Sequence, residues 1–327
     1  MFFYLYQRYI LEMKPIQIIC LIFSLTLLRC QKEVKRQETN KLKQYITILG
    51  TAQDAGYPQI NCEKECCKVF YEGKEGNKLV SSLGVIDLVA NKKYIFDATP
   101  DIVKQTQILK DKHIDNETII DGVFLTHAHI GHYTGLMYLG REAMGAKKVP
   151  VYAMPKMKQF LEQNAPWSQL VSLKNIELRK LVEDSTITIY NKLKVTPFLV
   201  PHRDEFSETV GYKIEGENKS ALFIPDINKW QLWKKSIVEE VKKVDYAFLD
   251  ATFFKAGEIP RPMEEVPHPF IIETVKLFEN EEEIVKKKVN FIHFNHTNPA
   301  LLKSHYLKDS IQNLGYKFAR RGQIFSL

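Results

Sequence analysis

Three histidines lie in one short segment of this chain, between an apolar run and a run with helical spacing. They are His127, His129 and His132, in the stretch FLTHAHIGHYTGL, and the whole chain of 327 residues contains only nine histidines. Neutral imidazole is the commonest protein ligand of first-row divalent metals. Three imidazoles on one loop therefore indicate a metal site.

Three further ionisable side chains occur where other predicted strands end. His202 follows the run KVTPFLVP, Asp226 follows ALFIP, and His293 closes VNFI. Strand ends on one edge of a sheet converge, so these side chains can share one site with the histidine segment. Each of them alone is more often an ordinary hydrogen-bonded residue than a ligand, and only their matched placement favours metal binding.

The elements that would carry these residues alternate along the chain from Tyr45 onward. Predicted strands lie at 45–50, 84–97 (a hairpin), 121–126, 150–154, 185–190, 193–200, 211–226 (a second hairpin), 244–250, 289–294 and 321–327. Predicted helices lie at 133–144, 155–164 and 230–241, and a short helix follows Pro100. Strands in both halves of the chain, with helices between them, predict one layered α/β domain without an internal linker.

The composition supports a folded domain and argues against a nucleic-acid groove. Hydrophobic residues make up 45% of the chain, which is enough for a sizeable core. The formal net charge is +7, but the lysines are scattered and often neighbour acidic residues. Because no dense basic stripe with interleaved aromatic residues occurs, we predict a small-molecule substrate and no nucleic-acid partner. The sequence does not indicate an oligomeric state.

The N-terminal segment has the layout of an export signal. An apolar run at 16–28 follows a positive start and is too short to span a bilayer comfortably. This layout predicts a signal peptide over residues 1–29, with Met13 as the more typical start.

The end of this segment resembles a bacterial lipoprotein signal, in which a cysteine is acylated after cleavage. That cysteine would be Cys30, although Arg29 departs from the small residue that usually precedes it. We therefore expect an exported chain, periplasmic or on the cell surface, that is held to the membrane by a lipid and a polar tether at 30–44. A plain cleaved signal and an uncleaved anchor are the alternatives.

The histidine segment and its context resemble the metallo-β-lactamase superfamily, whose signature is His-x-His-x-Asp-His. The resemblance covers residues 45–327 and implies an αββα sandwich. The stretches LGTAQDAGYPQINC, FDATPD, LDATF and IHFNHTNP are similar to the branch that contains the pyrroloquinoline-quinone biosynthesis B proteins. This resemblance implies membership in that branch, not the same reaction.

The resemblance also implies a ligand set for two cations. His127, His129 and His202 would hold the first, while His132 and His293 would help to hold the second, with Asp226 bridging both. The signature aspartate falls on Gly131, so the second position has lost a carboxylate. We therefore expect one cation, or a second at low occupancy, and we expect that Gly131→Asp adds metal uptake.

His296 departs from the asparagine that the family pattern has three residues after His293. It could replace the missing ligand or act as a general acid in catalysis. A hydrogen-bonding residue at the rim of the site is the simpler interpretation.

Three cysteines, Cys62, Cys66 and Cys67, follow the first predicted strand. They resemble the cysteine group around a structural zinc in cytoplasmic relatives, although the spacing differs. His268 is the candidate fourth ligand, which would complete a closed site of three thiolates and an imidazole. Buried free thiols, or one disulfide with a spare cysteine, are the alternatives, and export favours the disulfide.

The leading functional hypothesis is a metal-dependent hydrolase. A bound Zn²⁺ lowers the pKa of its water to about 7, and the resulting hydroxide would attack a phosphodiester or another ester or amide. Asp226 would orient that nucleophile as well as bind metal. The same ligands suit Fe²⁺, so an oxidative enzyme is the main alternative. A non-catalytic binding lipoprotein, with Gly131 marking decay of the site, is the third.

Overall fold

The computed structural model describes residues 42–190, 192–260, 262 and 265–327. Contacts between Cα atoms divide the chain into two units, Met1–Lys43 and Gln44–Leu327, and the second is described below by itself. The predicted signal segment, Cys30 and almost all of the predicted tether lie outside the described residues. Among the described helices, none is both long and apolar enough to cross a membrane.

Seven strands form the first sheet, in the order β14-β1-β2-β3-β4-β5-β6. Their bounds are β1 Gln44–Gly50, β2 Ser82–Asp87, β3 Lys92–Phe96, β4 Gly122–Phe124, β5 Val149–Ala153, β6 Ile176–Lys180 and β14 Ile324–Ser326. The pairs from β14 to β3 are antiparallel, and those from β3 to β6 are parallel. Every residue of β1 and β2 is buried, as expected for strands that are covered on both faces.

The second sheet also has seven strands, in the order β13-β12-β11-β10-β9-β8-β7. Their bounds are β7 Ile187–Tyr190, β8 Leu193–Leu199, β9 Val210–Glu215, β10 Ser220–Ile224, β11 Tyr246–Asp250, β12 Val289–Ile292 and β13 Lys317–Phe318. Strands β7 to β10 pair antiparallel, and β10 to β13 pair parallel. The parallel strands end at one edge of the sheet, where the side chains that follow them can meet.

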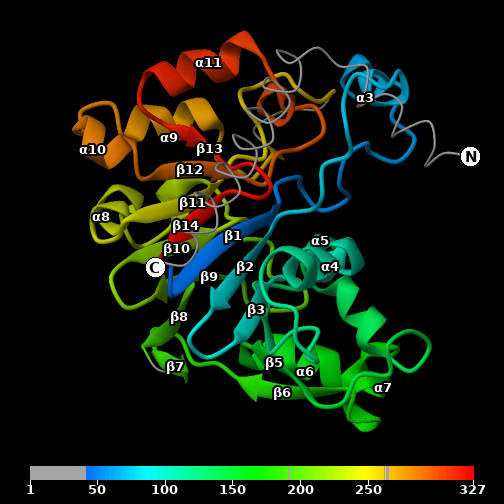
Figure 1. Cartoon of the computed structure of the whole chain (residues 1–327). Coiled ribbons are helices and arrows are strands. Elements are labelled where there is room, and N and C mark those ends of the chain that lie inside the picture. Colours follow the sequence, from blue (N-terminus) through cyan, green and yellow to red (C-terminus); the bar gives the residue numbers. More distant parts are fainter. Residues whose placement is uncertain (1–41, 191, 261, 263–264) are drawn as a thin grey trace, which may run out of the picture. The chain divides into compact units, whose positions relative to one another are not determined.

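Helices cover the outer face of each sheet. Their bounds are α3 Glu65–Tyr71, α4 Ile102–Lys112, α5 Ile130–Tyr133, α6 Pro155–Gln163, α7 Trp167–Ser172, α8 Ile237–Lys242, α9 Ile271–Leu277, α10 Glu283–Lys286 and α11 Tyr306–Asn313. Figure 1 shows α4 to α7 beside the first sheet and α8 to α11 beside the second.

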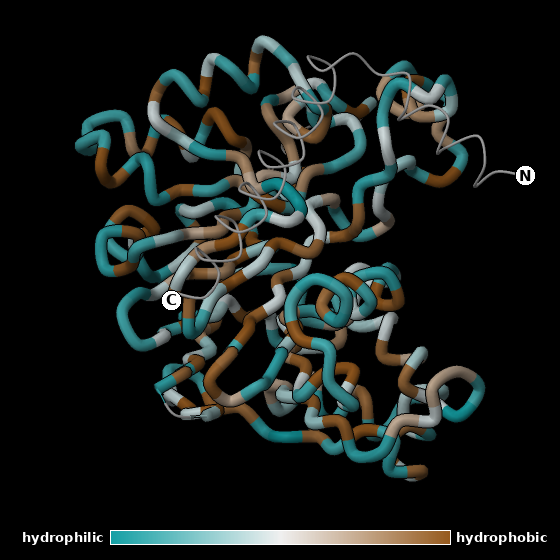
Figure 2. Tube along the Cα trace, viewed as in Figure 1, coloured by the Kyte–Doolittle hydropathy of each residue, from teal (hydrophilic) through white to brown (hydrophobic). Residues whose placement is uncertain are grey.

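The two sheets pack face to face through aromatic side chains. The ring of Phe96 on β3 lies 5.3 Å from that of Tyr212 on β9 and 6.3 Å from that of Phe223 on β10. A second apolar layer between the second sheet and its helices includes Leu249 and Trp230. Figure 2 shows hydrophobic segments along the strands of both sheets. This order of layers, helix, sheet, sheet and helix, confirms the predicted αββα sandwich.

The predicted helix at 133–144 is wrong in form. The chain makes the short helix α5 and then a 3₁₀ segment, Thr134–Leu139, that ends at Gly140. Backbone hydrogen bonds explain the difference, because Gly135 N donates to Ala98 O (2.9 Å) and Ala98 N donates to His132 O (2.8 Å). These bonds tie the segment to the end of β3 and hold His132 in place. The predicted helix at 230–241 is likewise divided, into a 3₁₀ turn and α8.

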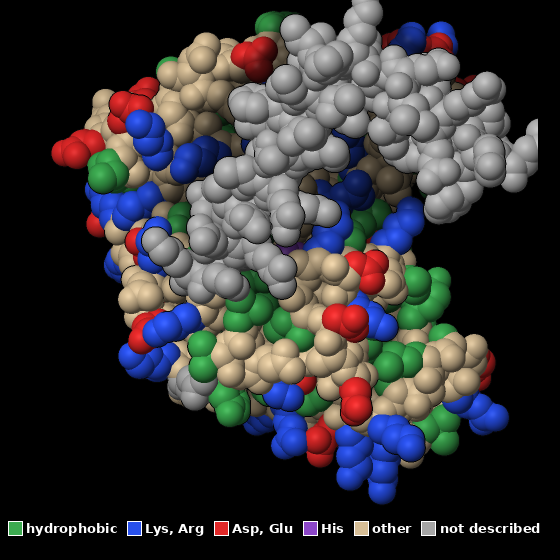
Figure 3. Space-filling view, in the orientation of Figure 1, with side chains coloured by type: hydrophobic (Ala, Val, Ile, Leu, Met, Phe, Trp, Pro, Cys, Tyr) green, Lys and Arg blue, Asp and Glu red, His purple; other side chains and the backbone are tan. Residues whose placement is uncertain are grey.

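The surface charges are mixed. Figure 3 shows Lys and Arg side chains spread over the visible face among Asp and Glu. Many are paired, as in Lys242 with Glu239 and Glu281, at 2.9 and 3.0 Å. Exposed pairs of this kind contribute little to stability, because water and salt screen them.

Candidate metal centre

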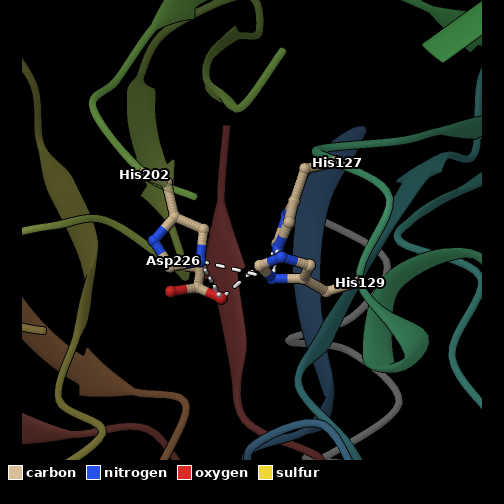
Figure 4. A group of neighbouring side chains, drawn as sticks. All are labelled: His127, His129, His202 and Asp226. Carbon is tan, nitrogen blue, oxygen red and sulfur yellow. Dashed lines mark hydrogen bonds and ion pairs between the residues drawn. The ribbon is translucent and has the colours of Figure 1, made fainter. Parts of the chain in front are cut away.

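The histidines and Asp226 lie just beyond the ends of strands in both sheets. His127 and His129 follow β4 of the first sheet, while His202, Asp226 and His293 follow β8, β10 and β12 of the second. Figure 4 shows the first pair approaching from one side and His202 with Asp226 from the other. The packing of the two sheets therefore brings together residues that are far apart in the sequence.

The first group of ligand atoms comes from His127, His129, His202 and Asp226, and all four atoms lie within 4.8 Å of one another. Asp226 Oδ2 lies 3.3 Å from His127 Nε2 and 3.3 Å from His202 Nε2. His129 Nδ1 lies 2.9 Å from His127 Nε2. Three imidazole nitrogens and one carboxylate oxygen directed at one point form a donor set that suits Zn²⁺ or Fe²⁺.

Contacts on the far side of each ring orient this group. The second ring nitrogens of His127, His202 and His129 lie next to oxygens, which are Thr126 Oγ1 at 3.0 Å, Asn228 Oδ1 at 3.0 Å and Glu205 Oε2 at 3.3 Å. The hydroxyl of Thr126 itself donates to Asp97, so its lone pairs are free to accept from His127. Each ring can thus carry its proton on the outer nitrogen and direct a lone pair to the centre.

A second group consists of Asp54, His132, His293 and again Asp226. His132 Nε2 lies 3.0 Å from Asp54 Oδ1. His293 Nδ1 pairs with Thr252 Oγ1 at 2.9 Å. Its Nε2 is buried, has no hydrogen-bond partner among the described residues, and lies 3.5 Å from Asp54 Oδ1. An unpaired buried nitrogen beside two carboxylates fits a cation position.

The electrostatics of the two groups are dominated by buried carboxylates and imidazoles. Burial lowers the pKa of His127 well below its ordinary value, and the neighbouring His132 adds to this effect. Burial would also lower the pKa of His132, but Asp97 and Asp54 outweigh it and raise this pKa well above the ordinary value. Burial alone would raise the pKa of Asp226, yet His202 and other imidazoles hold it well below its usual range. Since ligands must be deprotonated, a cation would replace the protons that these imidazoles share.

His268 lies beside this centre and not beside the cysteines. Its Nδ1 is 3.1 Å from Asp226 Oδ1 and 2.9 Å from Asp250 Oδ2. Burial would lower the pKa of His268, but these two carboxylates raise it to about 10. The prediction that His268 completes a site with the cysteines is therefore wrong. His268 lies beside Asp226 and Asp250, at the ends of β10 and β11.

The cysteines are instead grouped with His296. Cys62 Sγ lies 3.8 Å from Cys66 Sγ, and both offer a ligand atom within 4.8 Å of a ring nitrogen of His296. Cys67 is buried, and its Sγ accepts a hydrogen bond from Gln59 N at 3.4 Å. All three thiols are free, so the structure holds no disulfide among them. His296 faces this group and belongs to neither of the two histidine–aspartate groups, so it does not replace the missing ligand. Its role as a general acid stays a prediction.

Sequence reasoning missed several carboxylates that support the centre. Asp97 pairs with His132 Nδ1 at 2.7 Å, and Asp250 pairs with His268. Both follow or close predicted strands, YIFD and AFLD, so the same attention to strand ends would have found them. Asp54 lies in the segment GTAQDAGYPQ after β1, where no metal-ligand spacing marks it.

The fold and the site have counterparts among known proteins. A family model described as a β-lactamase superfamily domain matches residues 92–294. The coenzyme PQQ synthesis protein B of Cupriavidus taiwanensis is 23% identical over 309 residues, and the match covers 86% of this chain and 99% of the relative. That of Methylorubrum extorquens is 25% identical over 313 residues, covering 86% of this chain and 100% of the relative.

Solved structures share the fold. The crystal structure of Zn²⁺-bound PqqB from Methylobacterium extorquens has a TM-score of 0.73 and 22% identity, covering 86% of this chain and 100% of that chain. A diphosphatase from the PhnP family has a TM-score of 0.60 and 24% identity, covering 87% and 97%.

The matched domain spans more than half of the chain, so this protein belongs to the metallo-β-lactamase superfamily. Within the superfamily, it is similar to the PQQ synthesis B proteins.

The first group gives a direct test of metal binding. The double variant His127→Ala, His129→Ala should lose about one metal ion per chain, because it removes two of the nitrogens of a four-ligand site. Elemental analysis of the purified protein measures this loss. The matched control is His113→Ala, His305→Ala, in which both histidines lie outside the groups described above, and its metal content should not change. Equal metal content in the two double variants would contradict the assignment.

The cysteine group gives a second test, because bound zinc would shield the thiols. We expect His296→Ala to make Cys62 and Cys66 react rapidly with a disulfide reagent such as dithionitrobenzoate, and to release zinc. His268→Ala should leave the thiols shielded. The opposite pattern, with exposure only in His268→Ala, would restore the prediction made from the sequence.

Proposed function

We propose that this protein is a hydrolase that uses two divalent cations to cleave a phosphodiester or a related ester. The observation that carries this proposal is the membership of Asp226 in both ligand groups. A carboxylate shared between two groups can hold two cations side by side, the arrangement that many phosphate-ester hydrolases use. The cations would supply a hydroxide nucleophile at neutral pH and stabilise the negative charge of the transition state.

The residues of the two groups would have different roles. His127, His129 and His202 would hold one cation, and His132 with His293 would help to hold the other. Asp226, which belongs to both ligand groups, would help to hold both cations and would orient the attacking water. The water oxygen would bond to phosphorus, the bond to the leaving oxygen would break, and the proton would end on that oxygen. His132 keeps its position through Asp97, which is wholly buried.

A cavity next to the centre is the candidate substrate site. It has a volume of about 260 Å³, and its lining includes Gln53, Arg203, Phe253, His268 and His296. The guanidinium of Arg203 and the ring of His268, held between two carboxylates, are donors that an anionic ester would engage. This size suits a small molecule better than a polymer. The neighbour described as a diphosphatase also favours a phosphate ester.

Two other functions remain as alternatives. Three imidazoles with one carboxylate also suit Fe²⁺ and oxygen chemistry, and the relatives named for PQQ synthesis make this the main one. A non-catalytic binding protein is less favoured, because the second group contains Asp54 in addition to His132, His293 and Asp226.

The hydrolase proposal is tested with the zinc- or manganese-loaded protein and bis(p-nitrophenyl) phosphate as the probe. The wild type should release nitrophenol, and Asp226→Asn should lower kcat/KM by at least about 100-fold, since it removes the charge shared by both groups. Asp115→Asn, a change at an exposed aspartate, is the control and should keep full activity. No turnover by the metal-loaded wild type, with oxygen uptake by the iron-loaded protein, would favour the oxidative alternative.

From residues 13–30 alone we also propose that the chain is exported and anchored through an acylated Cys30. Cells that express the full chain and are fed labelled palmitate should incorporate the label into the wild type. Cys30→Ser should remove the label, with Cys20→Ser as the matched control. Retention of the label in Cys30→Ser, or no label in the wild type, would overturn the anchor.

A further inference from the structure

Gly131 occupies the position at which the superfamily signature has an aspartate, and the space beside it is already filled. A Cβ atom at residue 131 would lie 2.5 Å from Asp54 Cα and 2.6 Å from Asp54 Oδ1. Such distances are far below van der Waals contact, so a side chain at 131 and the present position of Asp54 exclude each other. Asp54 thus occupies the space that the first side-chain atom of any other residue at position 131 would need.

The segment that carries Asp54 is fixed to the strand that delivers His293. Phe294 N donates to Thr51 O at 2.8 Å, and Gln53 N donates to Phe294 O at 2.8 Å. Gly56 N closes the next turn onto Gln53 O, also at 2.8 Å, with the positive φ of 76° that favours glycine. These backbone bonds set the distance between residue 54 and the second ligand group.

The contacts of Asp54 are those of a ligand. Its Oδ1 lies 3.0 Å from His132 Nε2 and 3.5 Å from His293 Nε2. The other nitrogens of both rings are already engaged, by Asp97 and Thr252. Both Nε2 atoms and the Asp54 carboxylate are therefore directed at one point, together with Asp226.

We propose that Asp54 supplies the carboxylate that the signature lacks, so that the second cation is held by Asp54, His132, His293 and Asp226. In the superfamily signature this carboxylate belongs to the histidine loop, whereas here it comes from the loop after β1. Gly131 has no side chain and so leaves room for it. The prediction that the second position lacks a carboxylate is therefore revised. This inference rests on the proposed two-cation function.

The role of Asp54 as a ligand is tested by titrating the metal-free full chain, wild type and variants, with Mn²⁺. Electron paramagnetic resonance reports whether two bound ions are spin-coupled. The wild type should bind two ions at the centre with a coupled spectrum. Asp54→Asn and Asp54→Ala should each bind the second ion at least about tenfold more weakly and give the spectrum of an isolated ion. Asp115→Asn, a change at an exposed aspartate outside the ligand groups, should behave as the wild type.

The outcomes separate the two proposals. A wild type that binds no coupled pair would overturn the two-cation function itself. A coupled pair that persists in both Asp54 variants would overturn only the role of Asp54. Gly131→Asp in the wild-type background should take up no additional metal and should unfold at a lower temperature, because its Cβ overlaps residue 54. Additional metal uptake by this variant would also contradict the inference.

Discussion

The structure of this protein depends on one buried carboxylate, that of Asp226. It is almost fully buried, and its Oδ2 lies 3.3 Å from His127 Nε2 and from His202 Nε2 and 3.8 Å from His132 Nε2. Burying an uncompensated charge costs on the order of several kcal/mol. The imidazoles that offset this cost come from the first sheet as well as the second. Packing the two sheets against each other therefore also assembles the site.

Two of the seven described non-glycine residues with positive φ lie at the same centre. Asp97 and His293 both have φ of 68°, in the left-handed region that residues other than glycine seldom adopt. Hydrogen bonds hold the side chains of both residues. Asp97 accepts from Thr126 N at 2.8 Å, and Thr252 Oγ1 fixes the His293 ring. Strain that the surroundings maintain in this way is typical of functional sites. Here it turns the side chain after β3 and the side chain after β12 toward one point.

The sequence was sufficient for the sandwich and for the residues at strand ends. Alternating strand and helix patterns predict a layered α/β domain, and the family resemblance implies the αββα order of its layers. The positions of His127, His202 and Asp226 after apolar runs predict where they meet. The role inferred for Asp54 could not be predicted, because its distance from Gly131 depends on the bonds between residues 51–53 and Phe294. No local pattern records such a contact between distant segments.

The sequence predicts His268 beside the cysteines, whereas the structure places His296 there. This difference has a similar cause. His296 follows His293 by three residues, so its direction is set by the turn that leaves β12. His268 contacts Asp226 and Asp250, which precede it in the sequence by many residues. Local spacing cannot choose between two histidines when contacts between distant segments decide which of them reaches the cysteines. The sequence also did not predict the 3₁₀ segment within 133–144, because that segment depends on backbone hydrogen bonds with the distant Ala98.

Anomalous diffraction at the zinc absorption edge, from crystals grown with zinc, tests most directly whether Asp226 joins two cation positions. Two peaks are expected at the centre, one among His127, His129 and His202 and one among Asp54, His132 and His293, each near the Asp226 carboxylate. A map without a peak near Asp226, or with peaks only on surface residues, would contradict this arrangement.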